Sequence, residues 1–178
     1  MASPHNKNSS SQAELKKAWY HGFHKFEHGI YAGIKSFFIA KVVKYDPKKH
    51  IADVLPLANW SDGTKSAQYL DLPVTESCYL FDEMVDALKP EFAKADVDHA
   101  LPAHAGVPAH SHTQFVAKLP KRHFMRTGVP VVCAVLDRDN DNWGGGRSVN
   151  TYTPNSGRMH DANDAIVIGI LGGTWLDG

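Results

Sequence analysis

Hydrophobic residues in the first part of the chain repeat at helical spacing. Between residues 13 and 38 they fall at Leu15, Trp19, Phe23, Phe26, Ile30, Ile34 and Phe37. Steps of three or four residues place all of them on one face of an α-helix. Ser11, with Glu14 three residues later, is typical of a helix N-terminus. We therefore predict an amphipathic helical arm over 13–37, preceded by a disordered polar lead over 1–12.

The apolar face of this arm is a candidate interface. Gly22, Gly29 and Gly33 lie within the predicted helix, and each lowers its intrinsic stability by roughly 1 kcal/mol relative to alanine. A helix that keeps three glycines is expected to pack closely against another surface. Periodicity does not distinguish a helix lying on its own domain from one docking on a partner subunit. The aromatic residues and nearby lysines make binding to a membrane surface a third interpretation.

From residue 38 onwards the spacing changes to that of β-strands. The runs FIAKVVKYD (38–46) and IADVLPLAN (51–59) are rich in β-favouring residues and are joined by a short polar turn. This arrangement predicts a β-hairpin. The next run, QYLDLPVTESCYLF (68–81), continues as a predicted strand that is broken at Pro73.

The middle of the chain interrupts the strand pattern. The segment DEMVDALKPEFAKA (82–95) is compatible with a helix, although Pro90 is expected to interrupt it. The following residues, 96–115, are rich in His, Ala and Pro and show no clear period. We treat residues 82–115 as one long insertion.

Strand signals return in the last third of the chain. They cover 115–120, 128–137 and 164–173. A helix followed by about five strands predicts a mostly β protein. We expect a five-stranded OB-like barrel over 38–173, with the N-terminal amphipathic helix and the His/Pro-containing insertion, and a short tail at 174–178.

Composition narrows the class of protein. The 178 residues are 43% hydrophobic, which is enough for one domain with a real core. Basic and acidic residues both number 19, so the charge balance argues against wrapping nucleic acid. The polar N-terminus lacks a signal-peptide core, so we expect a protein made in the cytoplasm and not exported. Cys78 and Cys133 are expected to be buried free thiols, with a disulfide as the alternative.

Two histidines stand one residue apart in PAHSHTQF. On a strand, His110 and His112 point to the same face. Two imidazoles are common metal ligands but fill only part of a coordination shell. The alternative is a solvent-facing loop in which both are simply polar. His99 and His104, in the same insertion, are expected to be loop residues.

No catalytic constellation accompanies these histidines. RMHDANDA contains His160, Asp161 and Asp164, but no nucleophile motif goes with them, and the two carboxylates are expected to shape a turn. The acidic run LDRDNDN (136–142) lacks the glutamate that ends a calcium-binding loop. A cupin-type metal site requires Glu where Val116 stands. We therefore predict that the protein is not an enzyme.

Three stretches together resemble a known family. They are AKVVKYDPKKHIADVLPL, TGVPVVCAVLDRDNDNW and RMHDANDAIVIGIL. In this order they resemble the N-terminal OB-fold domain of the central spike proteins of contractile-tailed phages, the membrane-puncturing family related to baseplate assembly protein V and to type VI secretion spikes. The resemblance spans 38–173. One departure is Gly128-Val129, where the family usually has Gly-Asp.

The resemblance implies a function and a set of partners. It implies a homotrimeric central spike or hub-cap of the phage tail baseplate, a structural virion protein made in the host cytoplasm. The implied partners are the baseplate hub, tail-tube or tape-measure proteins and, transiently, the host envelope, with no nucleic acid. Three chains would bring six imidazoles from His110 and His112 to the three-fold axis. That set suits iron, with zinc or nickel as competitors. The alternative function is an OB-type oligonucleotide- or glycan-binding module.

Overall fold

The chain forms two compact units. The computed structural model describes residues 12–60, 62–96, 100–101, 105–106, 108, 110–111 and 114–173. The first unit is Met1–Lys35 and the second is Ser36–Gly178. In the described part, the first unit is helical and the second is mostly sheet with one further α-helix. The predicted mostly β protein with an N-terminal helix is confirmed at this level.

The N-terminal helix is shorter than predicted. Helix α1 spans Gln12–Gly33, and the amide of Ile34 bonds to the carbonyl of Tyr31 at 3.3 Å in a tightened last turn. Phe37, predicted to end this helix, instead begins strand β1 (Phe37–Asp46), where it pairs with Ala134. Phe37 is therefore a residue of the sheet and not of α1.

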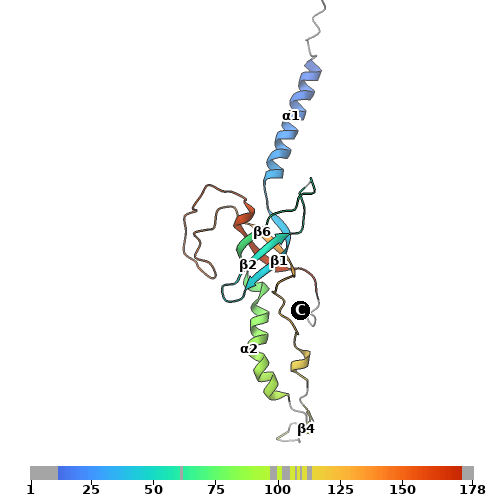
Figure 1. Cartoon of the computed structure of the whole chain (residues 1–178), viewed down its shortest axis with the longest axis vertical. Helices are drawn as coiled ribbons and strands as arrows, with labels where there is room; N and C mark the ends of the chain where they lie inside the picture. The colour runs from blue at the N-terminus through green and yellow to red at the C-terminus, as the bar shows by residue number, and fades with distance from the viewer. Residues whose placement is uncertain are drawn as a thin grey trace, which may run out of the picture. The chain divides into compact units, whose positions relative to one another are not determined.

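The second unit is built on one curled sheet. Its strands are β1, β2 (Ile51–Pro56), β3 (Tyr69–Pro73), β6 (Pro130–Val135) and β7 (Ala165–Ile170). Their order is β3-β2-β1-β6-β7, with every neighbouring pair antiparallel, and they form a half-barrel (Figure 1). The two edges meet just past β3, where Val74 forms a parallel bridge with Val167. There the amide of Thr75 donates to the carbonyl of Val167 at 2.9 Å.

The predicted hairpin between β1 and β2 is confirmed. Its turn is held by Asp46, whose Oδ1 accepts from the amides of Lys48 at 2.9 Å and Lys49 at 3.2 Å. A carboxylate that binds the backbone two and three residues later is a standard device for a tight turn. The turn ends at His50, which has a left-handed backbone with φ of 52°.

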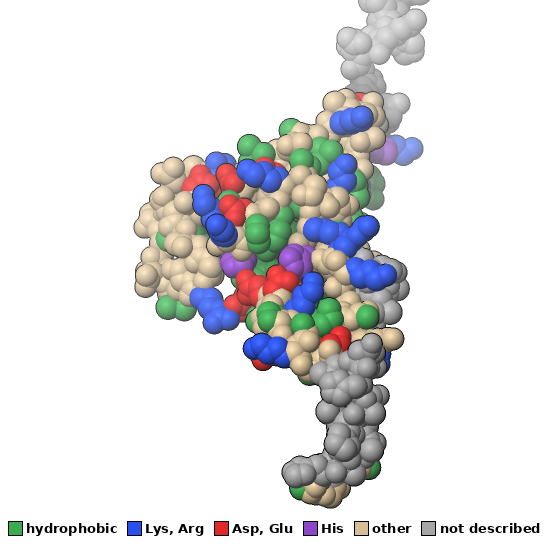
Figure 2. Space-filling model, turned by 60° about the horizontal axis from the view of Figure 1, so that its bottom comes forward, with side chains coloured by type: hydrophobic (Ala, Val, Ile, Leu, Met, Phe, Trp, Pro, Cys, Tyr) green, Lys and Arg blue, Asp and Glu red, His purple; other side chains and the backbone are tan. Residues whose placement is uncertain are grey.

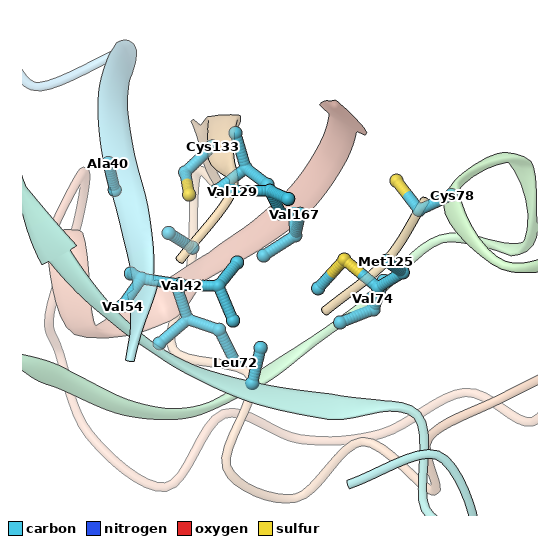
Figure 3. Packing of buried hydrophobic residues seen from close by; sticks show 13 residues of the cluster. Ala40, Val42, Val54, Leu72, Val74, Cys78, Met125, Val129, Cys133 and Val167 are labelled. Carbon is cyan, nitrogen blue, oxygen red and sulfur yellow. The ribbon is translucent and has the colours of Figure 1, made fainter. Parts of the chain in front are cut away.

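The core of the half-barrel consists mainly of small aliphatic side chains (Figure 3). Its fully buried members include Ala40, Val42, Val54, Leu72, Met125, Val131, Cys133 and Val167. Cys78 and Cys133 are both buried and free, so the free-thiol prediction is confirmed. Burial raises the pKa of both thiols, that of Cys133 to about 12, because the thiolate is poorly solvated there.

The insertion begins with a helix that passes through its proline. Helix α2 spans Leu80–Ala95 and contains Pro90, so the predicted interruption is wrong. Pro90 is exposed, so the carbonyl that it leaves without a helical partner can bond to water. Beyond it, Phe92 stacks on Phe115 with ring centroids 6.2 Å apart, which helps to hold the second half of the helix.

A buried carboxylate of α2 holds the segment around Phe124 and Met125 beside the helix. Asp82, only 7% exposed, accepts from the amides of Phe124 at 2.8 Å and Met125 at 2.9 Å. Phe81 also packs edge-on against Phe124, with ring centroids 5.6 Å apart. The insertion therefore leaves the half-barrel as a helix with a segment fixed beside it.

A second carboxylate explains another difference from the prediction. Residues 115–120, expected to be a strand, contain instead the 3-10 helix η2 (Val116–Lys118). Asp96, at the end of α2, accepts from the amides of Phe115 at 2.7 Å and Val116 at 3.1 Å. These two amides bind a carboxylate in place of a neighbouring strand.

Candidate functional site

The predicted metal pair belongs to the far part of the insertion. His110 begins strand β5 (His110–Ser111), which pairs with β4 (Ala100–Leu101). In Figure 1 this short ladder lies at the end of α2 that is remote from the half-barrel. His112, His99 and His104 lie outside the described residues. Metal binding by His110 and His112 therefore stays a prediction.

The apolar face of α1 is exposed along the helix. Trp19, Phe23 and Phe26 are 68%, 64% and 68% exposed. Trp19 and Phe23 lie with ring centroids 5.8 Å apart, and Gly22 opens a notch between the aromatic rings. Ile30 and Ile34 extend the face, whereas the side chain of Leu15 lies outside the described residues.

Arg158 joins three aspartates in the second unit. Its Nη2 lies 3.3 Å from Asp139 Oδ1, 3.0 Å from Asp141 Oδ2 and 2.9 Å from Asp164 Oδ1. Asp139 and Asp164 are fully buried, and Asp141 is exposed. We call these four residues the arginine cluster. It ties the loop after β6 to the segment that leads into β7.

Hydrogen bonds favour the charged forms of Asp139 and Arg158. The pKa of Asp139 is lowered first by a 2.5 Å bond from the Ser156 hydroxyl, then by the amide of Asp141 at 2.9 Å, and also by the charge of Arg158. The pKa of Arg158 is raised, chiefly by its hydrogen bonds to Asp164. Both net pKa shifts favour the charged forms, although burial acts against them.

The same three aspartates have the spacing of a metal site. One oxygen from each of Asp139, Asp141 and Asp164 lies within 4.8 Å of the others. However, Arg158 Nη2 contacts an oxygen of all three. Because the guanidinium already supplies the positive charge that a bound cation would supply, we assign the cluster a structural role.

Asp161 and Asp164 of the motif RMHDANDA have different structural roles. Asp161 accepts from the amide of Asn163 at 2.9 Å at the start of the 3-10 helix η3 (Ala162–Asp164), so its predicted turn role is confirmed. Asp164 instead pairs with Arg158. Sequence reasoning missed this pair. Its only signal was that Arg158 and Asp164 share one short polar motif before an apolar strand.

A cleft of about 300 Å³ opens beside the β1–β2 turn. Segments far apart in the sequence line it: the turn, the end of β3 with the 3-10 helix η1 (Glu76–Cys78), the 143–147 loop, and β7. Its polar and aromatic lining residues are Lys49, His50, Thr75, Glu76, Tyr79, Trp143 and Arg147. The cleft itself was not predicted.

Stacking, an ion pair and a hydrogen bond position the side chains that line the cleft. The rings of His50 and Tyr79 stack with centroids 3.8 Å apart and planes 7° apart. Arg147 pairs with Glu76, and its Nε donates to Oε1 at 2.6 Å. The Trp143 indole N–H donates to the carbonyl of Ser148 at 3.4 Å.

Tyr45 and Glu83 contact the two ring nitrogens of His50. The hydroxyl oxygen of Tyr45 lies 3.5 Å from His50 Nδ1, and Glu83 Oε1 lies 3.5 Å from His50 Nε2. Burial, followed by the nearby Tyr79 and Glu83, raises the pKa of Tyr45 to about 12. Tyr45 therefore keeps its proton at neutral pH, and the imidazole is contacted through both ring nitrogens.

Charges of both signs are interspersed on one face of the molecule. On the face shown in Figure 2, Lys and Arg side chains lie among Asp and Glu side chains and not in one basic patch. In the part of the chain that the structure describes, neither helix has the length and apolar character required to cross a membrane. Comparison of the sequence with known protein families and with curated proteins finds no match.

Proposed function

We propose that the protein is a structural virion component, the trimeric central spike or hub-cap of a phage tail baseplate. It closes the tail tube and engages the host envelope on contraction. Its task is mechanical, and no residue acts as a catalyst. The support comes from the sequence resemblance, from the fold of the stretches that carry it, and from surfaces suited to assembly.

The three resembling stretches correspond to complete parts of the half-barrel. The first forms the β1–β2 hairpin, the second forms β6 and the loop after it, and the third forms η3 and β7. Along the chain, helix α2 lies between β3 and β6, the third and fourth strands of the five-stranded sheet in sequence order. A parallel bridge joins Val74 to Val167. Both features support an OB-type barrel, in which α2 and the residues after it form the insertion.

One observation carries the proposal. Asp139 belongs to the second resembling stretch, and Arg158 and Asp164 belong to the third. These residues, far apart in sequence, meet in the arginine cluster with both aspartates fully buried. A buried charge network between loops rigidifies a fold and offers no free base or nucleophile. The motifs therefore support a shared fold, and a rigid unit suits the proposed mechanical role.

Helix α1 supports assembly into a trimer. Its exposed face presents Trp19, Phe23 and Phe26 side by side, and large exposed apolar patches mark interaction sites. In the proposed trimer this face packs on neighbouring subunits or on the hub. The glycine notch at Gly22 allows a second backbone to approach closely.

The proposed trimer carries a metal on its axis. His110 and His112 of three chains supply six imidazoles, with iron favoured over zinc or nickel. Elemental analysis of the purified protein tests this proposal, with about one metal per three chains expected. Replacing His110 and His112 together by alanine should remove the metal, whereas His123→Ala should keep it. Metal-free wild-type protein would contradict the metal proposal.

The virion itself provides the test of function. An antibody raised against the purified chain should label contractile tails of the encoding phage at the baseplate end of the tail axis. Electron microscopy of gold-labelled tails locates the antigen. Label along the sheath, on the capsid, or absent from intact and disassembled tails alike would contradict the proposal.

A further inference from the structure

We propose that the cleft beside the β1–β2 turn is a glycan site that takes one sugar ring of an oligosaccharide. The cleft belongs to the second unit alone, so the inference goes beyond the virion role and does not depend on subunit assembly. It rests on the shape of the cleft, its rings, its backbone strain and its charged pair.

The size and walls of the cleft suit a single sugar ring. A volume of about 300 Å³ is at the small end of ligand pockets. Apolar side chains of Ile51, Pro73 and Ile166 line it together with the rings of Tyr79 and Trp143. Sugar rings have apolar C–H faces and a polar edge, so flat aromatic surfaces and a few polar groups can bind both parts at once.

His50 is held in a strained conformation within this wall. Its φ of 52° lies in the left-handed region, which is unfavourable for a residue with a side chain. The stack on Tyr79 and the contacts of both ring nitrogens hold the imidazole in one orientation. A polar ring fixed in advance loses little entropy when a ligand binds.

The charged pair at the cleft favours hydroxyl groups over phosphates. Arg147 offers N–H donors, and Glu76, only partly exposed, offers acceptor oxygens beside them. A sugar hydroxyl both donates and accepts, so adjacent hydroxyls match such a pair. A phosphodiester only accepts, so it could bind Lys49 and Arg147, but it would leave the acceptor oxygens of Glu76 beside them without a donor. The chemistry therefore favours a glycan over a nucleic acid.

Nuclear magnetic resonance of the full-length protein tests the site directly. The probes are maltotetraose, the tetramer of N-acetylglucosamine, tetragalacturonate and a twelve-residue oligothymidylate. The indole N–H resonance of Trp143, assigned from a Trp143→Phe spectrum, reports on the cleft. We expect a saturable shift of this resonance with at least one of the oligosaccharides.

Variants connect the shift to the proposed contacts. Arg147→Ala and Glu76→Gln should each weaken binding by about tenfold or more, because a charged hydrogen-bonding partner is lost. Arg138→Ala, an exposed arginine on the same loop outside the cleft, should bind as wild type does. Amide spectra of each variant check that the fold is retained.

Three results would overturn the inference. One is an unmoved Trp143 resonance with all three oligosaccharides at millimolar concentration. Another is a shift with oligothymidylate only, lost on adding salt, which would identify the cleft as a nucleic-acid site. The third is equal saccharide affinity in wild type and Arg147→Ala. None of these results bears on whether the chain is a trimer or part of a tail.

Discussion

The guanidinium of Arg158 forms a bidentate pair with the buried carboxylate of Asp164. Its Nε donates to Oδ2 at 3.2 Å and its Nη2 donates to Oδ1 at 2.9 Å. The same Nη2 reaches Asp139, which is also fully buried. Two loops of the half-barrel therefore share one cation, and the stability of the unit should depend on it.

Replacing Arg158 by alanine should strongly destabilise the second unit. Two buried carboxylates would lose their shared partner, and an uncompensated buried charge is costly. The urea midpoint of unfolding, followed by circular dichroism, measures the effect. Arg138→Ala is the matched control, because among the described residues the guanidinium of Arg138 forms an ion pair with exposed Asp137 alone. Equal midpoints for the two variants would contradict the structural role of the arginine cluster.

Asp139 should make stability sensitive to acid. Its pKa is lowered from an ordinary value of 3.8, first by the Ser156 hydroxyl. A lowered folded-state pKa gives stability that is present above the unfolded pKa and lost as pH falls through the folded pKa. The urea midpoint should therefore fall below about pH 4. Ser156→Ala should reduce that fall, and an unchanged pH profile in this variant would contradict the assignment.

Asp82 should stabilise the base of the insertion. Asp82→Ala leaves two amides, those of Phe124 and Met125, without their acceptor. We expect a loss of about 2–3 kcal/mol in the free energy of unfolding. Asp86→Ala, which breaks an exposed pair with His123, should cost less than about 1 kcal/mol. Urea titrations of both variants give the comparison, and a larger loss from Asp86→Ala would sink the argument.

The apolar face of α1 should be required for assembly. The double change Phe23→Glu and Phe26→Glu places two charges on this face and should reduce the trimer to single chains. The control, Lys25→Glu with His28→Glu, also introduces two carboxylates, on other faces of the same helix, and should remain trimeric. Light scattering coupled to size exclusion measures both masses. Identical masses for both double variants would argue against this interface.

Regular elements were predictable from the sequence where local patterns and packing agree. The alternating apolar residues on either side of Asp46-Pro47 predicted the β1–β2 hairpin. The prediction held because the Asp46 carboxylate, which favours a turn, accepts the backbone hydrogen bonds of that turn. The strand expected at residues 115–120 failed because Asp96, from another segment, binds its amides. A side-chain acceptor nineteen residues away in sequence leaves no periodic signal.

The candidate sites were less predictable than the strands. The pair of Arg158 with Asp139 and the cleft lined by His50 and Trp143 both depend on loops that the curled sheet brings together. Spacing along one segment cannot reveal such contacts. The histidine pair His110-Ser111-His112 is conspicuous in sequence, but its proposed ligand role involves neighbouring chains, which the fold of one chain does not test.

Sedimentation equilibrium of the full-length protein tests the central claim most directly. We predict a single species with the mass of three 19.6 kDa chains at micromolar concentration. A single species with the mass of one chain, unchanged as concentration rises, would contradict the trimeric spike.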